Sequence, residues 1–245
     1  MDQDKRMHLS DPLPMRLSMQ SACPYIVGQT EQRIAVDVSL DPKVHDALAR
    51  AGFRRVENWV YRPTCPNCTA CTPWRVDAPA FRASRNLTRI RRINHDLQRR
   101  VTGPEVTPKH YELFKCYVTQ RHEDGQMAMM GPEEFHNMII NSPIDTVLVN
   151  YHDGDDRLVA TAIADIQSDG LSAVYSFFDP AQSRRSLGSF IILDLLEMTG
   201  EAGLRWLYLG YYIAGSSKMM YKARYKPAEI YRDGVWQPFD PERSF

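Results

Sequence analysis

The chain of 245 residues can form one large domain or two smaller ones, and 43% of its residues are hydrophobic, which excludes a disordered or fibrous protein. Its 30 Lys and Arg residues balance its 30 Asp and Glu residues, so the net charge points to neither a nucleic-acid nor a membrane partner. The charge is nevertheless polarised. Residues 50–100 carry 12 arginines against three acidic residues, whereas residues 101–170 carry four basic and 12 acidic residues.

The first segments contain no apolar run of signal-peptide type and nothing near the roughly 18–20 apolar residues of a membrane span. The sequence therefore predicts a cytoplasmic protein without a membrane partner. Residues 1–20 lack a period and predict a loose arm. Alternation over residues 34–38 predicts a strand, Asp41-Pro42 starts a helix that ends at Leu48, and residues 55–62 predict another strand.

Three cysteines follow on an irregular loop, because prolines interrupt the backbone around Cys65, Cys68 and Cys71. An odd total of five cysteines fits a reducing compartment better than a disulfide framework. The three closely spaced thiols, with Cys23 as a fourth ligand, could hold zinc or an iron–sulfur centre. The alternative is that they are small residues in a Pro-rich loop.

A basic amphipathic helix is predicted over residues 84–100, where apolar residues keep helical spacing. Arg85, Arg89 and Arg92 recur on one face, and guanidinium groups suit the phosphates of an RNA backbone. The alternatives are a solvated face, or one that pairs with the acidic stretch 123–156 of the same chain.

The charge changes sign at Gly103-Pro104, which predicts a domain boundary there: residues 1–104 form a smaller N-terminal domain with the cysteines and the basic helix, and residues 105–245 form the second domain. The second domain is predicted to contain these elements in order: a helix over 109–121, strands over 157–166 and 171–178, a helix over 190–201 and a strand over 206–212. This order is typical of N-acetyltransferases. We therefore expect an α/β (α+β) fold with an N-acetyltransferase-like mixed sheet flanked by helices.

The segment Arg185-Ser-Leu-Gly188-Ser-Phe190 resembles the coenzyme A loop of that fold, but Phe190 stands where a small residue is usual. A bulky ring would keep a pyrophosphate away from the backbone amides of the helix. The fold is thus predicted to have lost this cofactor, and a coenzyme A-dependent N-acetyltransferase is kept as the alternative function.

A basic aromatic segment follows, in which Tyr211, Lys218, Tyr221 and Lys222 could stack on a terminal base and bind a phosphate. Part of it must be core, because strand residues point alternately inward and outward. His122, beside two carboxylates, is a candidate general base, although a structural role is the simpler interpretation.

Several ordered motifs resemble those of the bacterial aspartate/glutamate leucyltransferases, relatives of the arginyl-tRNA protein transferases. The motifs are Cys23-Pro-Tyr, Gly52-Phe-Arg-Arg, Tyr61-Arg-Pro-x-Cys-x-x-Cys-x-Ala-Cys71, Arg121-His-x-Asp-Gly-x-Met127, Asp169-Gly-Leu-Ser-Ala-Val-Tyr-Ser-Phe-Phe-Asp-Pro180, Arg185-Ser-Leu-Gly, Tyr208-Leu-Gly-Tyr and Lys218-Met-x-Tyr-Lys222. One departure is Tyr212, where Trp is expected. The resemblance implies transfer of leucine, or else arginine, from charged tRNA to the amino terminus of proteins that begin with Asp or Glu, which marks them for degradation by the N-degron pathway.

The implied chemistry is aminolysis of the aminoacyl ester, which needs aminoacyl-tRNA as co-substrate and no cofactor for the reaction itself. We expect Arg85, Arg89, Arg92, Tyr211, Lys218, Tyr221 and Lys222 to bind tRNA. Arg55, Arg75 and Arg185 are candidates for the acidic side chain of the acceptor, because a carboxylate favours a forked guanidinium. Asp179 and His122 are candidates for taking a proton. A noncatalytic, metal-containing RNA-binding protein is a further alternative.

Overall fold

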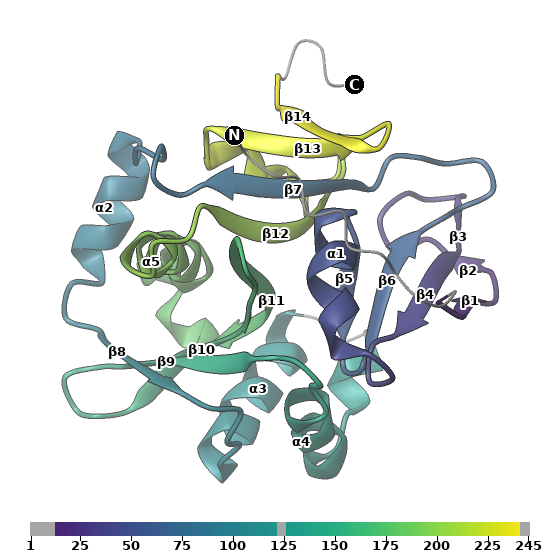
Figure 1. The fold of residues 1–245 in the computed structure, drawn as a ribbon. Helices are drawn as coiled ribbons and strands as arrows, with labels where there is room; N and C mark the ends of the chain where they lie inside the picture. Colours follow the sequence, from purple (N-terminus) through teal and green to yellow (C-terminus); the bar gives the residue numbers. More distant parts are fainter. Residues whose placement is uncertain (1–12, 122–125, 241–245) are drawn as a thin grey trace.

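The computed structural model describes residues 13–121 and 126–240, and an eight-stranded mixed sheet forms its centre (Figure 1). The strands are β7 (Thr72–Asp77), β8 (Gln98–Thr102), β9 (Thr146–His152), β10 (Leu158–Ile166), β11 (Gly170–Phe178), β12 (Trp206–Tyr212), β13 (Ala228–Arg232) and β14 (Val235–Pro238), in the order β14-β13-β7-β12-β11-β10-β9-β8. Within this sheet β11 and β12 pair in parallel, and the other neighbours are antiparallel. Parallel strands need a crossover, and helix α5 (Leu187–Glu201) supplies it.

Helices cover both faces of this sheet. Helix α5 packs against one face and is itself covered by α2 (Arg85–Ile93), so eight of its 15 residues are buried, seven of them apolar. Helices α3 (Pro108–Arg121) and α4 (Pro132–Ile140) pack on the opposite face against β9, β10 and β11, where Phe114, Phe135 and Phe177 form a fully buried aromatic core. The described residues also contain four short 3₁₀ turns: η1 (Pro42–Val44), η2 (Gln126–Met129), η3 (Pro180–Arg185) and η4 (Met220–Arg224).

A smaller antiparallel sheet lies on the side of the large sheet opposite α5 (Figure 1). It consists of β1 (Met15–Leu17), β4 (Arg33–Asp37), β6 (Trp59–Pro63) and β5 (Arg54–Val56), in that order, and it packs on α1 (His45–Arg50). A two-stranded ribbon, β2 (Ser21–Ala22) and β3 (Thr30–Glu31), lies between β1 and β4 in the chain. Strand β5 brings the small sheet into contact with β11.

The mixed α/β fold predicted from the sequence is confirmed, and the N-acetyltransferase-like series β10, β11, α5, β12 is present. The strand predicted over 55–62 is instead the hairpin β5–β6, because Glu57 takes a left-handed conformation (φ 52°) and turns the chain. Part of the predicted arm, Met15–Leu17, pairs with β4. Strands β7 and β8 precede residue 104 and belong to the large sheet, which therefore includes strands from both sides of the predicted boundary.

The basic helix predicted over 84–100 was too long. Helix α2 ends at Ile93, where the side chain of Asn94 bonds the carbonyl of Ile90 at 2.9 Å and that of Arg185 at 2.8 Å. The chain then turns into β8, and Arg99 becomes a strand residue that pairs with Glu201 at 2.5 Å. In the described part of the chain, no helix is both long and apolar enough to cross a membrane.

Candidate active site at the separation of two parallel strands

The parallel strands β11 and β12 pair over only three residues and then separate. Their paired residues are Gly170–Ser172 and Trp206–Tyr208. Each strand is irregular just beyond this point: β11 contains an extra residue at Val174 relative to β10, and β12 contains an extra residue between Tyr208 and Tyr211 relative to β7. Bulges bend strands and disrupt the ladder, so the two bulges hold the strands apart and leave backbone groups free of each other.

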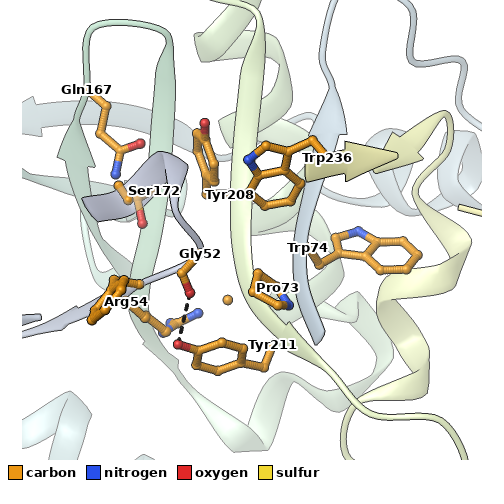
Figure 2. Close-up of a pocket in the computed structure, with 12 residues that line it drawn as sticks. Gly52, Arg54, Pro73, Trp74, Gln167, Ser172, Tyr208, Tyr211 and Trp236 are labelled. Atoms are coloured by element: carbon orange, nitrogen blue, oxygen red, sulfur yellow. Dashed lines mark hydrogen bonds between the residues drawn. The ribbon is translucent and has the colours of Figure 1, made fainter. Parts of the chain in front are cut away.

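Arg54, from strand β5 of the small sheet, fills the start of this gap (Figure 2). Its Nη2 donates to the carbonyls of Ala173 and Val174, at 2.8 and 2.5 Å, at the β11 bulge itself. Its guanidinium also lies directly against the α-carbon of Gly210. A Cβ built on Gly210 would fall on Nη1 and lie only 2.6 Å from Cζ, and Gly210 has a φ of +71°. A residue without a side chain is therefore required where the guanidinium crosses β12.

Tyr211, the next residue of β12, ties the site to the small sheet. Its hydroxyl has one proton to donate and lies within hydrogen-bond distance of two carbonyls, that of Gly52 at 3.1 Å (Figure 2) and that of Tyr61 at 2.9 Å. Burial is the main reason that the pKa of this phenol is raised, so the hydroxyl keeps its proton and remains a donor.

Lys222 lies on the other side of the same residue. Its side chain is buried, with 4% of its surface exposed, and its Nζ donates to the carbonyl of Tyr211 and to the sulfur of Met219. Burial and then the positive charge of Arg54 lower the pKa of Lys222 to about 7, while the Cys71 thiol acts in the opposite direction. Among the described residues no acidic side chain forms an ion pair with either Arg54 or Lys222.

A small cavity adjoins this arrangement between α1, β5 and the face of β12. It has a volume of about 20 Å³ and is bordered by Arg54, Ser172, Tyr208, Tyr211 and Trp236, among others. This volume is close to that of a single water site. The cavity thus has room for a small polar group and none for a leucyl ester.

The three arginines predicted to bind the acidic acceptor all face acidic residues of the chain itself. Arg55 is buried and forms a forked pair with Asp165, with both bonds at 2.7 Å and side-chain exposures of 1% and 0%. Arg75 bonds Glu229 at 2.6 Å and lies between the rings of Trp206 and Trp236, and Arg185 bonds Asp96 at 2.8 Å. A carboxylate of the chain already occupies each fork, so these guanidinium groups have the partner that a substrate would supply.

Of the residues predicted to bind tRNA, Tyr211 and Lys222 are buried and the other five are exposed. Arg85, Arg89 and Arg92 are exposed on α2, and none of them forms an ion pair with a described residue; the neighbouring Arg91 pairs with Glu197 of α5 at 3.1 Å. Helix α2 therefore packs on α5 and leaves its arginine face to solvent. Lys218 and Tyr221 are exposed as well.

The predicted proton acceptors lie outside the strand gap or outside the described residues. Asp179 caps η3, where its carboxylate accepts from the Ala181 amide at 3.0 Å and from the Gln182 side chain at 3.1 Å. His122 falls outside the described residues. The crowding expected from Phe190 is not observed, because its ring packs in the core, edge-on to Tyr151 at 5.4 Å between centroids.

The predicted metal ligands Cys23, Cys65, Cys68 and Cys71 are half-buried, and each is a free cysteine. Burial, followed by the charges of the other three thiols, raises the pKa of Cys71 to about 12, so the four lie close enough to influence one another. In residues 13–121 and 126–240, no three His, Cys, Asp or Glu side chains are arranged to hold a metal ion. Thiols suit zinc or iron chemically, so the four cysteines stay predicted ligands.

Two family models match the chain: the N terminus of arginine-tRNA-protein transferase over residues 21–89 and its C terminus over residues 109–232. The chain belongs to the arginine-tRNA-protein transferase family. The family predicted from the sequence motifs is thus confirmed, and the chain is that of a transferase. The predicted boundary at residue 104 falls between the two matched segments, although the large sheet includes strands from both.

Individual relatives show which members of the family the chain resembles. A protein of Gluconacetobacter diazotrophicus is 42% identical over 223 residues, which cover 90% of this chain and 86% of the relative. A protein of Ruegeria pomeroyi is 45% identical over 224 residues, with coverages of 90% and 82%. Both are named aspartate/glutamate leucyltransferase. Among solved structures, L-PGS from Bacillus licheniformis is similar with a TM-score of 0.51 at 14% identity, over 69% of this chain and 58% of the other, and therefore shares the fold alone.

Sequence reasoning missed Arg54 as a site residue and chose its neighbour Arg55. Adjacent residues of a strand point to opposite faces, so the alternation rule shows that these two arginines cannot share an environment. It does not show which one faces the strand gap. That assignment depends on Asp165, which is 110 residues away in the sequence and attracts Arg55 to its own side.

Proposed function

We propose that this protein transfers leucine from leucyl-tRNA to the α-amine of proteins that begin with Asp or Glu. The main support is the match to relatives named aspartate/glutamate leucyltransferase over about nine-tenths of the chain. The strand gap provides the place: backbone groups released where β11 and β12 separate can align an extended aminoacyl ester. Because the small cavity beside it cannot hold the ester, the leucyl group would lie across its mouth.

The tRNA would approach along the surface formed by η3, η4 and α2. Arg184 is exposed in η3, directly before α5, and Arg224 of η4 reaches Ser189 in the first turn of α5 at 3.1 Å. A helix N-terminus with nearby guanidinium groups favours a phosphate. Asn94 joins the end of α2 to η3, so the exposed Arg85, Arg89 and Arg92 continue this cationic surface away from the gap. Lys218 and Tyr221 would contact the acceptor end.

In the reaction, the acceptor α-amine attacks the ester carbonyl, the C–N bond forms, and the ribose hydroxyl leaves with a proton that the amine releases. An α-amine has a pKa of roughly 7.7–8.0, so about a tenth of it is already neutral at pH 7. Alignment of this amine against an activated ester supplies much of the acceleration. A strong general base is not required, and Asp179 and His122 stay predictions for the proton acceptor.

The aminoacyl ester supplies the free energy, so we infer that the reaction itself uses no cofactor. A zinc or iron–sulfur centre at the four cysteines stays a prediction of the sequence. Elemental analysis of protein purified without chelators tests it: a stoichiometric metal supports the centre and its absence contradicts it. We further propose that the reaction takes place in the cytoplasm, where charged tRNA is available, and that its products enter the N-degron pathway.

The function is tested by incubating the protein with radiolabelled leucyl-tRNA or arginyl-tRNA and with peptides that differ only in a first residue of Asp, Glu or Ala. We expect label from leucyl-tRNA in the Asp and Glu peptides and none in the Ala peptide. Label from arginyl-tRNA alone would contradict the donor. Binding of tRNA without any labelled peptide would instead support a noncatalytic RNA-binding protein, and acetylation of the peptides with acetyl-coenzyme A would support an N-acetyltransferase.

A further inference from the structure

The strand gap contains two cationic side chains and no anion among the described residues. Three other arginines of this region, Arg33, Arg55 and Arg75, each have an acidic partner within 2.8 Å, whereas Arg62 bonds the backbone carbonyl of Ala51. Within the described part of the chain, Arg54 donates hydrogen bonds to backbone carbonyls alone, and the buried Lys222 bonds a carbonyl and a thioether sulfur. A buried cation without a counter-charge is costly. Arg54 thus has no counter-charge among the described residues, and a ligand carboxylate would supply one.

Geometry places the two cations together. Arg54 crosses β12 at Gly210, and Lys222 bonds the carbonyl of Tyr211, the next residue. They come from different halves of the chain, since Arg54 belongs to the small sheet and Lys222 to η4 after β12. A group bound beside the carbonyl of Tyr211 would therefore lie close to both side chains.

We propose that Arg54 and Lys222 form the site that binds the side-chain carboxylate of the acceptor's first residue. This assignment rests on the proposed leucyl transfer to proteins that begin with Asp or Glu, and it replaces the three arginines predicted from the sequence. The adjoining cavity of about 20 Å³ is close to a single water site, so the carboxylate would lie at its mouth, beside Arg54. The nearby exposed cations, in contrast, suit the larger phosphates of tRNA.

The electrostatics of the pair lead to a measurable consequence. The groups that act on Lys222 are Arg54 from β5, which together with burial lowers its pKa to about 7, and Cys71 from the loop before β7, which raises it. At pH 7.5 the amine is therefore mostly neutral before the acceptor binds. A carboxylate beside it favours the charged form, so binding an acidic acceptor should take up a proton.

The experiment measures binding of two peptides that differ only in Asp or Asn at the first residue, by calorimetry at pH 7.5 in buffers of different ionisation enthalpy. For the unmodified protein we expect the Asp peptide to bind at least tenfold more tightly and with proton uptake. Arg54→Gln and Lys222→Met should each remove most of this preference while affinity for the Asn peptide stays within about threefold. Lys222→Arg should keep the preference but lose the proton uptake, which a purely structural role of Lys222 would not produce.

Two matched variants serve as controls. Arg205→Gln removes an exposed guanidinium paired with Asp77, and Lys115→Met removes a half-buried amine that, like Lys222, donates to a backbone carbonyl (Ala128, 2.6 Å). Both should keep the preference for Asp. If Lys222→Met does not fold, Arg54→Gln and Lys222→Arg still test the proposed carboxylate site.

Three results separate this site from the proposed function. Variants at Arg54 and Lys222 that keep the Asp preference would overturn the site, even if leucine transfer is observed. A rise in KM for leucyl-tRNA with unchanged peptide affinity would also overturn it and would show that the cations bind a phosphate. Selective, proton-linked binding of the Asp peptide by a protein that never transfers leucine would support the site and contradict the function.

Discussion

Replacement of Gly210 by alanine tests whether the guanidinium of Arg54 must occupy the strand gap. The added methyl group falls on the position of Nη1, and the left-handed backbone at φ +71° disfavours any side chain. The second effect costs about 1–2 kcal/mol in folding free energy. The added methyl group displaces the flexible side chain of Arg54. Its direct cost is therefore the loss of the hydrogen bonds that Arg54 donates to Ala173 and Val174, about 1.5–3 kcal/mol.

The matched control is Gly215→Ala. Gly215 has nearly the same backbone conformation, with φ +76°, and an added Cβ there would meet no atom within 4 Å. It should therefore lose only the backbone contribution, about 1–2 kcal/mol, whereas Gly210→Ala should lose about 2.5–5 kcal/mol. Urea unfolding with equal m-values for the two variants measures this difference.

The same pair of variants separates stability from function. With both proteins fully folded, Gly210→Ala should lower kcat/KM for an Asp peptide by roughly 10–100-fold, since about 1.4 kcal/mol corresponds to a factor of ten. Gly215→Ala should leave kcat/KM within about threefold of the unmodified protein. If the two variants are equally stable and equally active, Arg54 does not depend on the bare backbone of Gly210, and the packing described for the gap is wrong.

Three further changes probe other parts of the molecule. Arg55→Met leaves the carboxylate of Asp165 buried without a charge partner and should cost about 3–5 kcal/mol of unfolding free energy, while the folded fraction keeps its preference for Asp over Asn peptides. Alanine at Arg85, Arg89 and Arg92 of α2 should raise the KM for leucyl-tRNA and reduce the salt slope of tRNA binding by about one for each arginine that binds a phosphate. Alanine at Arg91, which lies on the same helix and pairs with Glu197 of α5, serves as the control and should change both less. The unfolding free energy should rise with pH between about 7 and 10.5, because Lys222 holds a proton up to pH 10.5 in the unfolded chain but only up to about pH 7 when folded. Denaturation of the unmodified protein and of Lys222→Met across this pH range measures the effect. Identical slopes of unfolding free energy against pH for the two proteins would contradict the low pKa.

Five elements of the second half were predicted close to their observed bounds because their patterns are local, whereas α4, β9, β13 and β14 were not predicted. The apolar period of α5, the β-rich composition of β10 and β11 and the turn between those strands depend on neighbouring residues. The end of α2 was missed for the opposite reason. Arginines kept a helical spacing through residue 100, but Asn94 ends the helix with the help of Arg185, 91 residues later. No local window contains that contact.

Ion pairing limited the prediction of the site in the same way. From the sequence, an arginine in a basic segment is equally available whether or not an acidic residue faces it in the fold. Arg75 and Arg185 find Glu229 and Asp96 at sequence separations of 154 and 89 residues, so their availability could not be judged beforehand. The predicted group Tyr211, Lys218, Tyr221 and Lys222 was likewise split by burial, which depends on how β12 and η4 pack against the small sheet.

The position of Arg54 explains why acceptor recognition should require both halves of this chain. The gap exists because β11 and β12 of the large sheet separate at their bulges, but neither strand carries a cation there. The small sheet supplies Arg54, and Tyr211 fastens the two halves through the carbonyls of Gly52 and Tyr61. The large half supplies Lys222. An acidic first residue would thus bind only where the halves are correctly docked. The α-amine that faces an aminoacyl ester in the gap would then belong to an acceptor whose acidic side chain contacts both halves.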